Sequence, residues 1–275
     1  MVLACLLAPL ASSAQKPPDA AVQELPVPAD LVEPLARSSG IGRLLYVLDR
    51  VAAIGTDALL AEVPDPGRHG IAGYIPMQES EDDGTPKSSF LVSFYTGETP
   101  PRIAYTVRVA PGTKPVVDTF LPPKDTLPAF AAFVRARQLA MASADLSGQP
   151  LNPVLIPGEA IGEKGILVYL LAGTKKPDVV VLGRHTRVLV SEDGARVLAV
   201  TPLTKAVLEA PTRGSLAAVV VSQFATDYPV ETHVFASLVS KLPIYVITER
   251  GTWRVNGEAI AFLGDQQPNK PDKKE

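Results

Sequence analysis

Short runs of apolar and polar residues cover most of the chain, and their two-residue period is typical of strands. The run at 166–171 is apolar throughout, which predicts a central strand buried on both faces. The other strand candidates share shorter or alternating patterns. They lie at 71–77, 90–95, 102–109, 116–121, 179–190, 196–200, 217–222, 242–248, 251–255 and 258–262.

Two turn sequences predict β-hairpins in the second half of the chain. Ser191-Glu192-Asp193-Gly194 separates two strand candidates, and Asn256-Gly257 separates two more. Asp-Gly and Asn-Gly favour tight hairpin turns because they accept positive φ. We therefore expect a mostly antiparallel meander after the midpoint.

One segment, 126–143, has a clear helical pattern. Pro128 lies in its first turn, where helices tolerate proline, and apolar residues from Phe130 to Met141 form one stripe. Residues 41–62 and 230–238 fit either a strand or a helix. The pattern predicts an α+β fold, strand-dominated, with a mostly antiparallel sheet and one clear central helix.

Composition agrees with a folded, turn-rich body. Apolar residues make up 46% of the 275 residues and charged residues 20%, which excludes wholesale disorder. The 27 prolines are about twice average usage and favour short strands over long helices. We expect a disordered Pro-rich tether at 15–38, a globular body at 39–264 and a disordered tail at 265–275. Whether the body forms two lobes, 39–145 and 146–264, is open, and Gly148-Gln149-Pro150 is the candidate boundary.

The first residues predict export. Residues 2–11 are apolar and uncharged, and Ser12-Ser13-Ala14 offers a cleavage site, so we interpret 1–14 as a signal peptide. Cys5 is the only cysteine and falls inside it, so a mature chain would hold no thiol. We expect a periplasmic or secreted protein. A lipoprotein acylated at Cys5 is the alternative.

Charge and hydropathy exclude two classes of partner. The net charge of −3 provides no electrostatic footprint for nucleic acid. No run approaches the roughly 20 apolar residues of a transmembrane helix. We expect no nucleic-acid partner, no transmembrane span and no cofactor; the oligomeric state is open.

The candidate chemistry centres on two histidines and a carboxylate. Glu231 and His233 would point to one face if this segment were an extended strand. His185 lies in another strand candidate, and adjacency of the two would create a two-His-one-carboxylate hydrolase or metal site. The alternative is a His–Glu cross-strand pair on a solvated face.

A second candidate site is basic. Arg184 and Arg187, with Arg196 across the hairpin, could bind an anion, although their spacing also fits an exposed sheet face. We find no Gly-x-Ser-x-Gly elbow and no dinucleotide fingerprint. The glycines of 158–165 lack the Gly-Lys-Ser/Thr ending of a phosphate loop.

Several stretches resemble a family of uncharacterised exported bacterial proteins of unknown function. They are Leu45-Tyr46-Val47-Leu48-Asp49-Arg50 with Thr56-Asp57, Leu182-Gly183-Arg184-His185-Thr186-Arg187-Val188, Glu231-Thr232-His233-Val234-Phe235, and Lys241-Leu242-Pro243-Ile244-Tyr245-Val246. The resemblance implies export and carries no activity, cofactor or site residue.

Two functions follow as hypotheses. The first is a non-enzymatic module that binds a protein, peptide or envelope component through an exposed sheet edge or face. The second is a hydrolase or metal-dependent enzyme centred on His185, Glu231 and His233. The sequence leaves open whether the protein is an enzyme.

Overall fold

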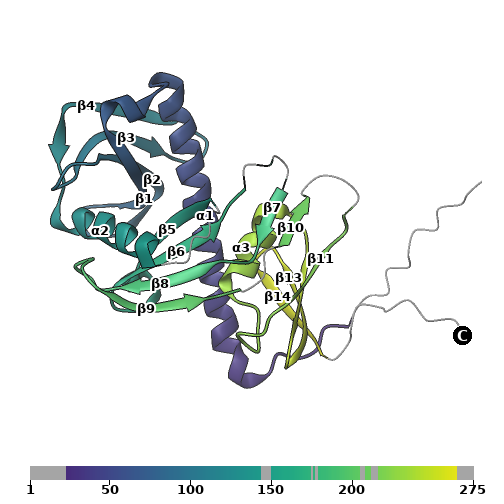
Figure 1. Cartoon of the computed structure of the whole chain (residues 1–275). Helices are drawn as coiled ribbons and strands as arrows, with labels where there is room; N and C mark the ends of the chain where they lie inside the picture. Colours follow the sequence, from purple (N-terminus) through teal and green to yellow (C-terminus); the bar gives the residue numbers. More distant parts are fainter. Residues whose placement is uncertain are drawn as a thin grey trace, which may run out of the picture.

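The part of the chain that the structure describes forms three four-stranded sheets and one two-stranded ribbon, which pack with three α-helices (Figure 1). The computed structural model describes residues 23–143, 150–174, 176, 179–204, 208–211 and 216–264. It confirms the α+β class dominated by antiparallel strands. The expected signal peptide, the tail and most of the candidate boundary tripeptide lie outside the described residues.

The first sheet is an antiparallel meander in the order β1-β2-β3-β4. Its strands are β1 (Ile71–Ser80), β2 (Pro86–Thr96), β3 (Arg102–Val109) and β4 (Val116–Asp125). The short 3-10 helix η2 (Pro66–His69) precedes it. β4 is an edge strand and leaves most of its side chains exposed.

The second sheet has the order β5-β6-β8-β9, all antiparallel. Its strands are β5 (Leu151–Pro157), β6 (Ile166–Ala172), β8 (Thr186–Val190) and β9 (Val197–Pro202), with η3 (Gly158–Ile161) between the first two. Every residue of β6 is buried, which confirms the prediction of a central strand. The 191–194 turn joins β8 to β9 as predicted, with Gly194 at φ 71°.

The third sheet has the order β11-β12-β13-β14. Its strands are β11 (Val219–Ser222), β12 (Ile244–Thr248), β13 (Gly251–Asn256) and β14 (Ala259–Gly264). β11 and β12 are parallel because α3 (Glu231–Ser240) connects them, so this part departs from the expected meander. The predicted Asn256-Gly257 hairpin joins β13 to β14. A separate ribbon pairs β7 (Val179–Leu182) with β10 (Leu208–Pro211).

The longest element is α1 (Val32–Glu62), which runs past both the first and the third sheet (Figure 1). It follows η1 (Ala29–Leu31). Residues 29–38 therefore belong to η1 and the first turns of α1 and are not the disordered tether that we expected. Pro34 is tolerated there because the first helical turn does not need its missing N–H. The ambiguous segments 41–62 and 230–238 are both helical.

The α1 helix and α2 (Pro128–Ser143) join the sheets into a continuous set of cores. α2 lies between the first and second sheets, and Phe133, Ile75 and Val168 belong to one buried cluster. α1 packs on the opposite face of the second sheet through residues such as Leu45, beside Tyr169 of β6. No helix in the described part of the chain combines the length and hydropathy needed to cross a membrane.

Candidate functional site

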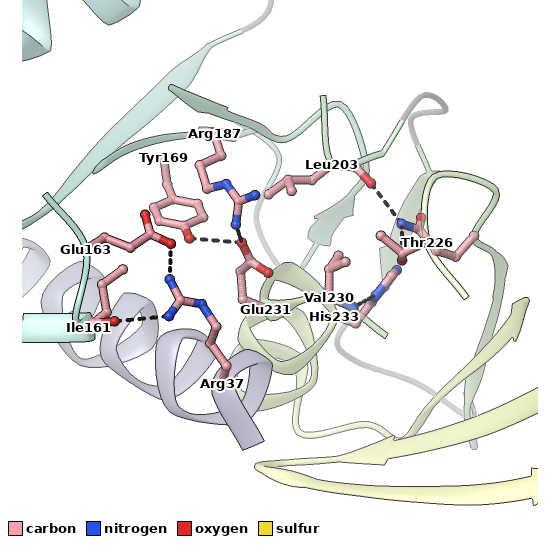
Figure 2. Close-up of polar contacts among 11 residues, drawn as sticks. Arg37, Ile161, Glu163, Tyr169, Arg187, Leu203, Thr226, Val230, Glu231 and His233 are labelled. Carbon is pink, nitrogen blue, oxygen red and sulfur yellow. Dashed lines mark hydrogen bonds and ion pairs between the residues drawn. The ribbon is translucent and has the colours of Figure 1, made fainter. Parts of the chain in front are cut away.

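The N-terminus of α3 meets the second sheet in a buried polar cluster (Figure 2). The Glu231 carboxylate accepts a hydrogen bond from the Tyr169 hydroxyl at 2.9 Å and pairs with Arg187 at 3.0 Å. The side chain of Glu231 is 5% exposed and that of Arg187 is 30% exposed. Tyr169 is on β6 and Arg187 is its cross-strand partner on β8. The sheet register thus places both donors opposite the first residue of α3.

Burial and mutual charge together shift the pKa values of Tyr169 and Arg187. Burial and the nearby Glu231 carboxylate raise the pKa of Tyr169, so its hydroxyl stays protonated and donates. Burial alone would lower the pKa of Arg187, but Glu231, Tyr169 and Glu163 together outweigh it and the pKa rises. The ion pair fastens α3 to the sheet. The raised pKa values of Tyr169 and Arg187 keep both groups protonated near neutral pH.

A second ion pair lies beside the first in Figure 2. Arg37 of α1 pairs with Glu163 and donates to the Ile161 carbonyl at 3.0 Å. The side chains of Arg37 and Glu163 are about one third exposed. This contact holds α1 against the turn between β5 and β6.

His233 is buried inside the first turn of α3. Its Nδ1 accepts the backbone N–H of Val230 at 3.1 Å and so caps the helix (Figure 2). Burial, with a smaller contribution from the neighbouring His185, lowers the pKa of His233 to about 3. The ring is neutral at physiological pH and satisfies an otherwise free backbone donor.

His185 is buried between β7 and β8. Its Nδ1 accepts the backbone N–H of Ala172 at 3.0 Å, so its Nε2 carries the ring hydrogen. Within the described part of the chain, Nε2 has no partner of hydrogen-bonding geometry. Burial lowers the pKa of His185 to about 4, and the Val181 backbone offsets only part of this. Because the Ala172 N–H occupies the lone pair of Nδ1 and Nε2 carries the hydrogen, the ring has no free lone pair to take up a proton.

The structure does not assemble the predicted His185, Glu231 and His233 site. Residues 231–240 form a helix, so Glu231 and His233, two positions apart, point in different directions rather than to one strand face. Glu231 faces Tyr169, whereas His233 turns back to its own helix N-terminus. Among the described residues, no three His, Cys, Asp or Glu side chains lie together as a metal site would require. The site required an extended strand at 231–233, and this condition is not met because the segment is helical.

The predicted basic patch is not assembled either. Arg187 is paired with Glu231, and it lies opposite Thr201 on β9. Arg196 lies at the other end of the hairpin, where its carbonyl accepts from the Ser191 N–H. Four residues of strand separate Arg187 from Ser191, roughly 13 Å. Arg184 is exposed before β8, with φ 53°.

A polar cluster that the sequence analysis missed joins α1, β1 and β5. Asn152 donates from its amide nitrogen to Asp49, and its amide oxygen accepts from the Tyr74 hydroxyl at 3.2 Å. Burial raises the pKa of Asp49 against the opposing charge of Arg50. Burial and the Asp49 charge raise the pKa of Tyr74. The three residues are distant in sequence and belong to no motif, so no sequence signal could have grouped them.

The exposed apolar residues gather partly on edge strands. On β9, Val197, Leu198 and Val200 are 36%, 52% and 43% exposed. β9 is the last strand of the second sheet and has β8 on one side only. A sheet edge with apolar side chains is a template for strand addition.

Comparisons with known proteins place the chain in no family: no family model, no curated protein and no solved structure matches it. The resemblance to uncharacterised exported bacterial proteins therefore stays a prediction from the sequence.

Proposed function

We propose that the protein is a non-enzymatic binding module that holds an extended peptide segment of a partner protein along β9. The observation that carries this proposal is the exposed apolar edge formed by Val197, Leu198 and Val200. Exposed edges of this composition are prone to uncontrolled pairing, and proteins usually protect them with lysine, proline or a covering loop. Among the residues of β9 itself, only Pro202, at the end of the strand, is of this protective kind.

Backbone geometry supports strand addition at Val200. The N–H of Leu203 bonds to the His185 carbonyl, and the register pairs Val200 with Val188. Hydrogen-bonded and non-bonded pairs alternate along an antiparallel ladder. Because Leu203 and His185 form a bonded pair, Val200 and Val188, three positions along the ladder, form a non-bonded pair. Val200 therefore directs its N–H and C=O away from β8, and an added strand would meet both groups.

A peptide suits this edge better than a second copy of the chain. β9 has six residues, whereas a stable protein interface needs roughly 20 to 30 residues on each side. A peptide gains main-chain hydrogen bonds without needing so large a surface. Arg196 is exposed at the start of β9, and its side chain forms no ion pair within the described residues. An acidic residue in the peptide would complement it.

The chemistry around α3 also favours a binding role. The two buried histidines accept hydrogen bonds from backbone N–H groups. Glu231 forms an ion pair with Arg187 and accepts a hydrogen bond from Tyr169. The predicted export of residues 1–14 would place such a module outside the cytosol. It remains a prediction from the sequence.

The test is selection of a random ten-residue peptide library on the immobilised protein, followed by anisotropy titration of the recovered peptides. We expect the double variant Leu198→Lys/Val200→Lys to weaken binding at least tenfold. The matched control Leu121→Lys, at a 92% exposed position of β4, should leave it unchanged.

Three outcomes would refute the proposal. They are the failure of any peptide to be selected, equal binding by wild type and double variant, and a β9-dependent dimer in light scattering. If the lysine variant does not fold, Val200→Pro replaces it. Proline removes only the outward N–H and keeps the β8 ladder.

A further inference from the structure

An open groove, apart from β9 and the α3 cluster, runs between α1 and the first sheet. It has a volume of about 460 Å³. Val47 and Ile54 of α1 form one wall and Phe90 of β2 forms another. The end of β3 and the turn at 110–115 close the third side.

The turn that closes the groove is held in shape by local hydrogen bonds. The Ala110 carbonyl accepts from the Thr113 N–H at 3.3 Å and from its hydroxyl at 3.1 Å. Gly112 has φ 70°, which fits a left-handed turn position. The wall is thus preformed, as is usual for small-molecule sites.

The charge of the groove has one sign. Arg50 is the only charged residue of its lining, and it is exposed. Its guanidinium forms no ion pair or hydrogen bond with any described residue. The neighbouring Asp49 is close enough for the charge of Arg50 to act on its pKa, but its hydrogen bond comes from Asn152 on β5. Lys114, also exposed, lies in the turn itself and adds a second positive charge near the opening.

The size and polarity of the groove together indicate the class of ligand that it can bind. The volume falls within the range of roughly 300–1,000 Å³ found for small-molecule sites. Fewer residues line the groove than a stable protein interface requires, which is roughly 20 to 30 on each side. The apolar walls would be complemented by an apolar part of the ligand, and the guanidinium of Arg50 by an anionic group.

We propose that this groove binds a single-chain amphiphile with an anionic head, of the class of long-chain carboxylates. The chain lies between Ile54, Val47 and Phe90, and the head group pairs with Arg50. The same chemistry can come from a free acid or from a lipid leaflet, and the test separates these sources. The proposal does not depend on the peptide function of β9.

The experiment titrates the full chain with dansylaminoundecanoic acid and displaces the probe with dodecanoate below its micellar concentration. Dodecanol, which has the same chain and a neutral head, and hexanoate, which has a short chain, are the ligand controls. The protein variants are Arg50→Gln, Arg50→Lys and Ile54→Ser. Arg43→Gln is the matched control because Arg43 is an exposed arginine seven residues earlier on the same helix.

We expect dodecanoate to displace the probe at least fivefold better than dodecanol or hexanoate. Arg50→Gln should abolish the advantage over dodecanol, Arg50→Lys should restore part of it, and Ile54→Ser should weaken both twelve-carbon ligands. Arg43→Gln should behave as wild type.

Equal binding by wild type and Arg50→Gln would overturn the proposal, as would no displacement or displacement only above the micellar concentration. Binding to anionic vesicles without binding of monomeric dodecanoate would also overturn it, because the surface would then recognise a membrane.

Discussion

Gly42 in α1 offers a direct test of how α1 and α3 pack. An added Cβ at this position would lie 2.5 Å from Cβ of Val234 and 2.6 Å from the backbone carbonyl of Glu231. Neither atom is the end of a flexible side chain, so neither can turn away. In Gly42→Ala the two helices must therefore separate by about an ångström to reach normal contact.

The expected cost follows from two opposing contributions. Forcing extra volume into a packed contact costs about 1–3 kcal/mol. Alanine recovers up to about 1 kcal/mol of helix propensity relative to glycine. Gly42→Ala should therefore lower the free energy of unfolding by up to about 2 kcal/mol, which corresponds to a loss of up to roughly 8 °C in Tm for a chain of this size.

Gly40 is the matched control because it lies in the same helix with nothing within 4 Å of an added Cβ. Gly40→Ala should raise the free energy of unfolding by about 0.5–1 kcal/mol through propensity alone. Thermal and urea unfolding, followed by circular dichroism, measure both variants. Stabilisation by Gly42→Ala similar to that by Gly40→Ala would refute the close contact between α1 and α3.

Two further predictions concern the buried polar groups. Glu231→Gln keeps an acceptor for Tyr169 but leaves the Arg187 guanidinium without its counter-charge, so it should cost about 2–3 kcal/mol in urea unfolding; an unchanged midpoint would contradict the ion pair. His185, with its pKa lowered to about 4, should destabilise the fold as pH falls from about 6.5 to 4, because the unfolded chain binds a proton that the native ring does not. The slope from this residue approaches about 1.4 kcal/mol per pH unit, and His233 continues the loss toward its pKa of about 3. His185→Asn, whose amide oxygen can still accept the Ala172 N–H, should flatten the slope by about one proton, and an unchanged slope would contradict the account.

Strands and hairpins were predictable from the sequence because their signals are local. The uninterrupted apolar run of 166–171 and the Asp-Gly and Asn-Gly turns depend on neighbouring residues only. Trp253 and Val255 alternate along β13, and both are fully buried.

The long helix α1 was harder to predict because it contains several residues that disfavour helices. Pro34, Gly40, Gly42 and Gly55 all have low intrinsic helix propensity. Gly42 and Gly55 are required by close neighbours, Val234 and Val92 respectively, which only the tertiary structure provides. Packing therefore outweighs propensity along this helix.

For the candidate site, the sequence indicated which residues are of interest but not what they contact. The sequence analysis singled out His185, Glu231 and His233, and all three are buried near the start of α3. Their roles depend on residue 231 beginning a helix, which the ambiguous periodicity of 230–238 could not decide. The partners Tyr169 and Arg187 come from sheet register, which no local motif encodes.

Amide hydrogen exchange of residues 196–202, with and without a peptide selected from the library, tests the proposed function most directly. The account predicts that the peptide slows exchange at Val200 and that the remaining sheet edges exchange as before. Protection at another edge, or at no amide of β9, would contradict it.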